Sequence, residues 1–309
     1  MRILIVGAGA TGGYFGAQLA RAGRDVTFLV RPKRADLLRE RGLRIVGLGR
    51  EQILEPRLIT APDLAEPYDL ILFSVKATGL DHALDDVAPA VGPSTVIVPF
   101  LNGMAHMDAL NRRFGAQRVF GGVVILVTTV NAEGDIVQFT PLSSMAVGEQ
   151  DGSATDRLAA VVAAVSGAGF EASAAGDIIA SMWHKWAFIS TVGAMTTLGR
   201  GTVGEITAVP GGAQLGPAVL AEAAAVTAAC GVPLPQTTLD STTATVTRRG
   251  SDFGSSMSRD AMDGLPTEVE HILGDFTARA RAHGVATPLL DLATLQLRVH
   301  ERRLSSAVR

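Results

Sequence analysis

Cysteine is nearly absent from this chain of 309 residues, and neither sign of charge dominates. Cys230 is the only cysteine, which excludes an intramolecular disulfide and a thiol-based metal cluster. The chain carries 27 Lys and Arg against 30 Asp and Glu, a formal charge of −3, so nothing favours nucleic acid or a membrane as a partner. Its six histidines show no ligand spacing with carboxylates, so we expect no metal site.

Long hydrophobic runs and aromatic residues are also scarce. The longest apolar stretch, residues 119–130, contains two glycines and is too short to span a bilayer. Met1 is followed almost at once by an apolar strand, which leaves no room for a signal peptide. Aromatic residues make up 5% of a chain that is 47% hydrophobic, so the cores are built mainly from Ala, Val, Leu and Ile. We expect a soluble cytoplasmic protein with roughly two domains.

A glycine-rich turn directly follows the first strand. Residues 3–6 form the apolar, β-branched run of a buried parallel strand, and Gly7, Gly9 and Gly12 then fit the spacing G-x-G-x-x-G. The first glycine permits a tight turn, the second lets the backbone approach a pyrophosphate, and the third lets the next helix pack closely. That helix, predicted over 13–22, would direct its free N–H groups at the phosphates. The motif predicts a dinucleotide site.

The end of the second predicted strand, residues 25–30, indicates which dinucleotide binds. NAD-binding chains usually place an acidic residue there for the ribose hydroxyls, whereas this chain has Arg31. A guanidinium suits a 2′-phosphate, which a carboxylate would repel. We therefore predict NADP(H), the alternative being a solvated basic helix start.

The order of predicted elements divides the chain at about Asp177. Before it, strands and helices alternate, which is typical of a doubly wound α/β domain with extra antiparallel strands. Beyond the first two, we predict strands at 68–75, 94–101, 119–129, 136–140, 145–148 and 170–174, helices at 79–87 and 156–167, and an edge hairpin within 41–55. After it, only helical spacing remains, and the Ser/Thr-rich residues 237–258 are interpreted as a helix and an ordered loop. We predict an α/β domain at 1–176 and an all-α domain at 177–309.

Two polar residues follow predicted strands of the first domain, where open α/β sheets bind ligands. Lys76 would emerge beside the nicotinamide half of a dinucleotide, and Asn102 offers an amide to a ribose, a carboxamide or a substrate carbonyl. Alternatively, Lys76 is a solvated strand end and Asn102 part of a turn.

Two further candidates lie in the helical domain. Lys185 stands between Trp183 and Trp186, which share a helix face, and a lysine beside such a low-dielectric patch can act as a general acid near neutral pH. The alternatives are a surface lysine and, less favoured, a catalytic His184. Glu268 follows a predicted helix start at residues 266–267, where an acid can simply stabilise the helix dipole.

Together these motifs resemble the 2-dehydropantoate 2-reductase (ketopantoate reductase) family over essentially the whole chain. The matching segments are Gly7-Ala8-Gly9-Ala10-Thr11-Gly12, Arg31, Ser74-Val75-Lys76, Asn102-Gly103-Met104, Trp183-His184-Lys185, Ser255-Ser256-Met257, Thr267-Glu268 and residues 280–288.

The resemblance implies a Rossmann-type domain followed by a helical domain like the C-terminal domain of 6-phosphogluconate dehydrogenase. It implies NADPH, held by the glycine-rich turn and Arg31, and a small 2-oxo acid as substrate. Lys185 would be the general acid, and Glu268 would orient it or the substrate hydroxyl. Ser256 would hold the substrate carboxylate. Lys76 and Asn102 would contact cofactor and substrate.

Three positions depart from the family pattern. Ile189, Gly193 and Phe253 stand where the family usually carries asparagines that bind polar groups of the substrate. We therefore expect a less polar pocket and a 2-oxo acid or ketone bulkier or less polar than 2-dehydropantoate. The alternatives are an opine-type dehydrogenase that reduces an imine and a non-catalytic NADP(H) sensor. The Ala/Val-rich helical domain also leads us to expect a homodimer.

Overall fold

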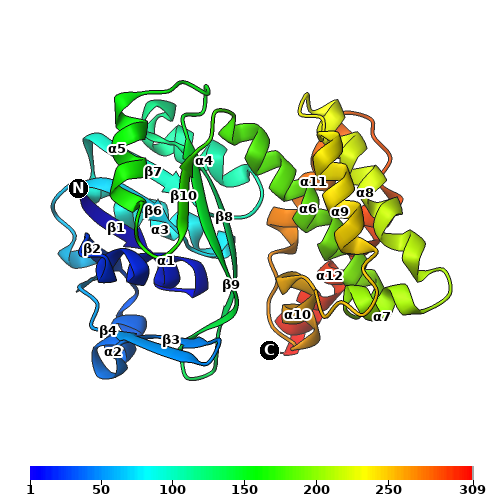
Figure 1. Cartoon of the computed structure of the whole chain (residues 1–309), viewed down its shortest axis with the longest axis horizontal. Coiled ribbons are helices and arrows are strands. Elements are labelled where there is room, and N and C mark those ends of the chain that lie inside the picture. The colour runs from blue at the N-terminus through cyan, green and yellow to red at the C-terminus, as the bar shows by residue number, and fades with distance from the viewer. Residues whose placement is uncertain (308–309) are drawn as a thin grey trace. The chain divides into compact units, whose positions relative to one another are not determined.

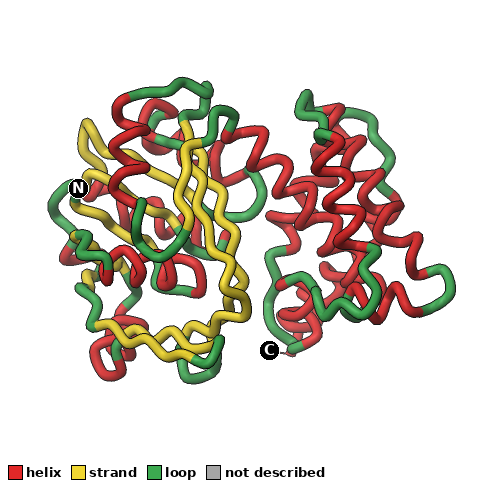
Figure 2. The backbone as a smooth tube through the Cα atoms, in the orientation of Figure 1, coloured by secondary structure: helices red, strands yellow, loops and turns green. Residues whose placement is uncertain are grey.

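The computed structural model describes residues 1–307 and divides into two compact units, which are described separately (Figures 1 and 2). The N-terminal unit comprises Met1–Leu101 and His106–Ser181. The C-terminal unit comprises Asn102–Ala105 and the chain from Met182 onward. The division falls inside one helix, a few residues after the predicted boundary, and it assigns Asn102 to the C-terminal unit.

The first sheet of the N-terminal unit is entirely parallel, with the strand order β5-β2-β1-β6-β7. Its strands are β1 (Arg2–Val6), β2 (Asp25–Leu29), β5 (Leu58–Ile59), β6 (Tyr68–Phe73) and β7 (Val91–Pro99). Ile3, Leu4 and Ile5 are all fully buried, because both faces of a parallel sheet are covered. The doubly wound sheet is confirmed.

Helices connect and flank these strands. They are α1 (Ala10–Arg21), α2 (Pro32–Arg41), α3 (Leu80–Val87), α4 (Ala105–Phe114) and α5 (Asp156–Val165), with short 3-10 turns at Ala61–Asp63, Ala77–Gly79, Ala88–Ala90 and Ala116–Arg118. The prediction that α1 begins at residue 13 is wrong: Gly9 is the N-cap, and its carbonyl already accepts the Gly13 N–H at 2.8 Å. The last part of the glycine motif is therefore the first turn of the helix.

The extra strands, which were predicted to be antiparallel, form a second sheet with both parallel and antiparallel pairs. It has the order β10-β9-β3-β4, and β8 pairs with β9. Its strands are β3 (Leu43–Gly47), β4 (Arg50–Leu54), β8 (Gly121–Val130), β9 (Ile136–Gly148) and β10 (Glu171–Ala174). Helix α1 contacts strands of both sheets, β1 and β2 as well as β8 and β9, so one core serves both.

The two strands predicted at 136–140 and 145–148 are a single strand, β9. Its pairing with β8 shifts register, so that Leu126 pairs with Ser143 while Thr128 pairs with Gln138. Pro141 lies between these paired positions of β9, where its missing N–H costs no ladder hydrogen bond. A proline that would break a regularly paired strand is thus accommodated by the irregularity.

Helices and connecting loops make up the described residues of the C-terminal unit, which contain no strand. Its helices are α6 (Ile178–Gly199), α7 (Val203–Ala208), α8 (Gly212–Ala229), α9 (Gln236–Val246), α10 (Ser256–Met262), α11 (Asp275–Ala282) and α12 (Pro288–Ala307), with a π-helical turn at Glu270–Gly274. The Ser/Thr-rich segment forms α9 and a loop, as predicted. In α8, an added Cβ at Gly216 would lie 2.7 Å from the Val246 side chain, so glycine allows α8 and α9 to pack closely.

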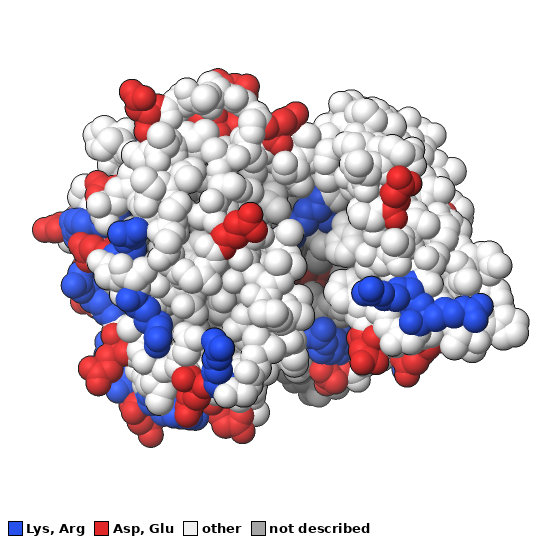
Figure 3. Space-filling view, in the orientation of Figure 1, with Lys and Arg blue, Asp and Glu red and all other residues white. Residues whose placement is uncertain are grey.

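Across residues 1–307, no helix combines the length and hydropathy needed to cross a membrane. On the face shown in Figure 3, acidic and basic side chains are interspersed within each unit, in keeping with the small net charge.

Candidate active site

The three motif glycines of the N-terminal unit occupy different surroundings. Gly7 has φ +96°, and an added Cβ would lie 2.9 Å from the Ser74 carbonyl oxygen, so the turn requires glycine. A Cβ at Gly12 would lie 2.3 Å from the Gly7 carbonyl oxygen. A Cβ at Gly9 would meet no protein atom within 4 Å. Gly7 and Gly12 therefore serve the fold of the turn, while Gly9 leaves backbone open on a side that a ligand can approach.

Two basic side chains lie at the carboxyl-terminal end of the strands of the first sheet. Arg31 is exposed at the N-cap of α2, and its Nη2 atom would lie 3.2 Å from a Cβ at Gly79. Lys76 is exposed at the start of the turn Ala77–Gly79, just after β6. The structure thus brings the Arg31 side chain against the loop that carries Lys76, beyond the carboxyl ends of β2 and β6.

Four predicted residues, Asn102, Lys185, Ser256 and Glu268, belong to the C-terminal unit. Lys185 is half-buried in the first half of α6. Burial lowers the pKa of Lys185 to about 8, and the attraction of the Glu268 carboxylate opposes that shift. An ammonium with a pKa near 8 can release a proton close to neutral pH, so this pair has the electrostatics of a general acid and its partner.

The tryptophans that flank Lys185 share a face of α6, as predicted, and their rings pack against each other. Their ring centroids are 5.1 Å apart, and Trp186 meets the Phe276 ring edge-on at 4.9 Å. The guanidinium of Arg279 lies over both indoles, 5.4 Å from Trp183 and 5.5 Å from Trp186. These contacts pack one side of α6 beside Lys185, which lies between the two tryptophans in sequence.

A π-helical turn carries the chain from Glu268 to α11. The Glu268 carbonyl accepts the N–H groups of His271 and Ile272, and Trp186 Nε1 donates to the Ile272 carbonyl at 2.9 Å. Trp186, the neighbour of Lys185, is thereby bonded to the turn that follows Glu268. The sequence does not reveal this link, because a π turn has no distinctive sequence pattern and the bonded residues are 86 positions apart.

The expected helix start at residues 266–267 is wrong. The Thr267 N–H and hydroxyl both donate to Glu301 Oε1, at 2.6 and 2.7 Å, and no helix forms until after Glu268. Glu268 therefore precedes the π turn and does not lie within a first helical turn. Glu301, which accepts both of these bonds, lies on α12 and is too distant in sequence for a local pattern to reveal it.

Asn102 and Gly103 lie beside the same π turn. Gly103 has φ +82°, and an added Cβ would lie 2.4 Å from the His271 carbonyl oxygen and 3.8 Å from the Trp186 ring. Only glycine fits this approach, so the Asn102-Gly103 pair has a structural requirement beyond that of an ordinary turn. Asn102 itself is half-buried.

Ser256 is the exposed first residue of α10, and Ser255 forms the cap of that helix. Ser255 Oγ accepts the Ser258 N–H and lies 2.9 Å from the Thr196 hydroxyl of α6. From the sequence, Ser255 is identified only as part of the segment Ser255-Ser256-Met257 that matches the family, with no role as a cap. Serine is among the preferred N-cap residues, and this preference is the signal that could have identified it.

Two of the three positions that depart from the family pattern, Gly193 and Phe253, face apolar side chains. The Phe253 ring lies 6.2 Å from the Phe188 ring and packs on the cluster around Val192. An added Cβ at Gly193 would lie 2.8 Å from the Met257 methyl group. Apolar side chains thus occupy the space around two positions where the family pattern predicts amides.

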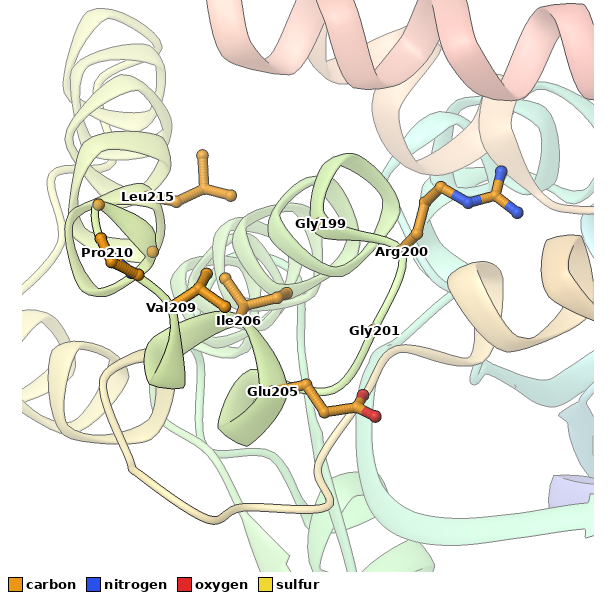
Figure 4. A pocket seen from close by; sticks show the side chains of 10 residues that line it. Gly199, Arg200, Gly201, Glu205, Ile206, Val209, Pro210 and Leu215 are labelled. Carbon is orange, nitrogen blue, oxygen red and sulfur yellow. The ribbon is translucent and has the colours of Figure 1, made fainter.

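A separate pocket of about 570 Å³ opens at the other end of α6 (Figure 4). Gly199, at its edge, is fourteen residues beyond Lys185, roughly 21 Å along the helix axis. The Arg200 guanidinium points away from the apolar side chains of Ile206 and Leu215 in Figure 4, and Glu205 is bonded to Thr202 in a capping box. The pocket therefore has no evident catalytic group. Within residues 1–307, no cluster of three His, Cys, Asp or Glu side chains could hold a metal ion.

Comparison with known proteins identifies the family. The family model described as ketopantoate reductase PanE/ApbA matches residues 3–152, and the model of its C-terminal part matches residues 177–301. An uncharacterized oxidoreductase, YkpB, of Bacillus subtilis is 33% identical over 301 residues, which cover 97% of this chain and 99% of that protein. The chain therefore belongs to the ketopantoate reductase family of oxidoreductases, which confirms the resemblance.

Solved structures share the fold over nearly the whole length. The 2-dehydropantoate 2-reductase of Geobacter metallireducens superimposes with a TM-score of 0.87 at 26% identity, covering 96% of this chain and 99% of that one. D-mandelate dehydrogenase, in a ternary structure with NADH and anilino(oxo)acetate, gives a TM-score of 0.87 at 22% identity, covering 99% and 100%.

Proposed function

We propose that this protein is an NADPH-dependent reductase that converts the carbonyl group of a 2-oxo acid to a hydroxyl group, with Lys185 as the general acid. The observation that carries the proposal is the half-buried Lys185 ammonium, whose pKa burial lowers to about 8 while Glu268 holds it up. Reduction of a ketone needs a proton donor where negative charge develops on oxygen, and a donor with a pKa near the working pH is the most effective.

The residues of the N-terminal unit fit a dinucleotide. Gly9 leaves open backbone at the N-terminus of α1, where unpaired N–H groups favour phosphate. Arg31 supports NADP(H) over NAD(H), because its guanidinium suits a 2′-phosphate. When bound, the reduced nicotinamide supplies the hydride. The D-mandelate dehydrogenase structure contains NADH. The preference of this protein is therefore tested by kinetics with both NADPH and NADH.

The remaining roles follow the family pattern. Lys185 donates its proton from Nζ to the substrate oxygen and regains one from solvent after the product leaves. Glu268 keeps the Lys185 ammonium protonated by its negative charge. The exposed Ser256 hydroxyl would hold the substrate carboxylate, while Lys76 and Asn102 would contact cofactor and substrate.

A less polar substrate than 2-dehydropantoate is supported by the surroundings of the departing positions. Met257 occupies the space beside Gly193, and Phe253 packs against Phe188. An apolar wall offers no hydrogen-bond partner to a polar hydroxyl of the substrate. Selectivity for a polar substrate depends on such partners, so their replacement favours a less polar one.

The test is the rate of NADPH oxidation, followed by absorbance, with a panel of 2-oxo acids that carry hydroxylated, branched aliphatic or aromatic side chains. We expect kcat/KM to be highest for apolar side chains. A kcat/KM for 2-dehydropantoate well above those of larger apolar analogues would overturn the substrate class. Oxidation that requires an added amine would indicate imine reduction, and binding of NADPH without turnover of any carbonyl would indicate a sensor.

A further inference from the structure

A second arginine, Arg34, contacts the glycine-rich turn itself. It lies in the first helical turn of α2, three residues after Arg31, and is half-buried. Its Nε and Nη2 atoms donate to the Ala8 carbonyl oxygen at 3.3 and 3.0 Å, and its Nη1 atom donates to the Gly134 carbonyl oxygen at 2.9 Å. All three guanidinium nitrogens are therefore engaged by main-chain carbonyl groups.

The bond to Ala8 fixes the orientation of the next N–H group. A trans peptide is planar, so the Ala8 carbonyl and the Gly9 N–H point in opposite directions. With the carbonyl held toward Arg34, the Gly9 N–H faces away from it. Gly9 is also the glycine whose added Cβ would meet nothing within 4 Å. Arg34 thus sets the direction of a donor beside the open side of the turn.

The other carbonyl that Arg34 contacts belongs to a well-formed turn between β8 and β9. The Gly134 N–H donates to the Asn131 carbonyl at 3.0 Å, and Asn131 Oδ1 accepts the Asp135 N–H at 2.7 Å. Gly134 has φ +85°, and an added Cβ would lie 2.8 Å from Arg34 Nη1 and 2.5 Å from the Leu37 side chain. Glycine at 134 therefore allows Arg34 to reach its carbonyl.

A buried carboxylate, that of Asp135, lies near Arg34 and pairs with two further arginines. Asp135 is 8% exposed and pairs with Arg41 at 3.3 Å and Arg44 at 3.6 Å. Burial lowers the pKa of Arg34, and the nearby Asp135 opposes that shift. Arg31, by contrast, is exposed, so the two arginines of one helical turn have different surroundings.

We propose that Arg34 is a positioning residue, which holds the Ala8–Gly9 peptide so that the Gly9 N–H faces the pyrophosphate of the bound dinucleotide. The inference rests on the proposed dinucleotide function and extends it. Arg31 then recognises the 2′-phosphate, which distinguishes NADPH from NADH. Arg34 instead promotes binding of the pyrophosphate, which the two cofactors share, through the Ala8–Gly9 peptide.

Two fragments of the cofactor separate these roles. ADP carries the pyrophosphate without a 2′-phosphate, and 2′-AMP carries a 2′-phosphate without the pyrophosphate. We would measure the Kd of each by isothermal titration calorimetry for the wild type, Arg34→Met and Arg31→Met. Arg34→Met should raise the Kd of ADP about tenfold and change that of 2′-AMP less than about twofold. Arg31→Met should show the reverse pattern.

Conservative and matched variants distinguish orientation from charge. Arg34→Lys keeps the charge but loses the fork that bonds two carbonyls, so ADP affinity should stay low. Restored ADP affinity in Arg34→Lys would mean that the charge acts directly and would overturn the proposal. Arg39→Met removes an exposed charge from the same helix, where it pairs with Asp36 at 2.9 Å, and should change neither Kd.

A second perturbation covers the case in which Arg34→Met does not fold. Gly134→Ala presses on Arg34 Nη1 from the opposite side and should weaken ADP binding while sparing 2′-AMP. Equal weakening of both probes, or a loss confined to 2′-AMP, would refute the positioning role. If the wild type binds neither NADPH nor ADP, the dinucleotide function fails first, and this inference fails with it.

Discussion

The glycine-rich turn of the N-terminal unit and the Lys185 region of the C-terminal unit prepare for chemistry by opposite means. The turn depends on missing side chains: Gly7 and Gly12 permit a tight backbone, and Gly9 leaves one side open. The Lys185 region depends on large side chains: the two indoles of α6 pack against each other and against Phe276 and Arg279. An exposed backbone suits recognition of the pyrophosphate, the anion that NADH and NADPH both carry. A packed environment suits the tuning of one proton.

The strongest test of this contrast removes the ionisable ammonium group of Lys185 and keeps a side chain of similar shape. Lys185→Met keeps an unbranched side chain, so kcat should fall about 10³-fold while the Kd of NADPH stays nearly unchanged. Stopped-flow absorbance and calorimetry measure the two quantities. His184→Ala is the neighbouring control and should retain most activity. A loss of kcat below tenfold in Lys185→Met would point to another proton donor.

A charge reversal at the N-terminal unit should affect binding and leave proton transfer alone. Arg31→Asp places a carboxylate where we propose the 2′-phosphate lies, so the KM for NADPH should rise about 100-fold while that for NADH changes little. Steady-state kinetics with both cofactors measure the preference. Unchanged preference would refute the assignment of NADP(H) to Arg31.

Two alanine substitutions separate the glycines that shape the turn from the one that leaves it open. Gly9→Ala meets no protein atom within 4 Å, so the free energy of unfolding should hold while NADPH affinity falls about tenfold. Gly12→Ala would collide with the Gly7 carbonyl at 2.3 Å and should lower the free energy of unfolding itself. Denaturant unfolding and calorimetry compare the two. Full NADPH affinity in Gly9→Ala would place the phosphates elsewhere.

The smallest expected effect is a displacement of the pH profile. The protonated form of Lys185 is the proposed acid, so kcat/KM for reduction should fall as the pH rises through about 8. Glu268→Gln removes the attraction that raises this pKa, so the fall should begin at lower pH. Rates measured between pH 6 and 10 test this. A profile that Glu268→Gln leaves in place, or moves to higher pH, would contradict the pairing.

The sequence predicted those parts of the site that local backbone rules govern. A strand, three spaced glycines and a helix define the turn within twelve residues, and the change to helical spacing near Asp177 separates the two folds. Arg34 and the π turn were missed because their partners are remote: Arg34 bonds Gly134 across 100 residues, and Trp186 bonds Ile272 across 86. The separate second sheet was missed for a similar reason, since β3 pairs with β9, far along the chain.

The excursion of Asn102–Ala105 into the C-terminal unit has a practical consequence for anyone dissecting the protein. A recombinant fragment that starts near residue 182 would lack the segment whose Gly103 backbone abuts the His271 carbonyl and the edge of Trp186. Those groups would then face water in the isolated piece. A gene fragment cut near codon 182 would therefore encode a helical unit that lacks the backbone packed against His271 and Trp186.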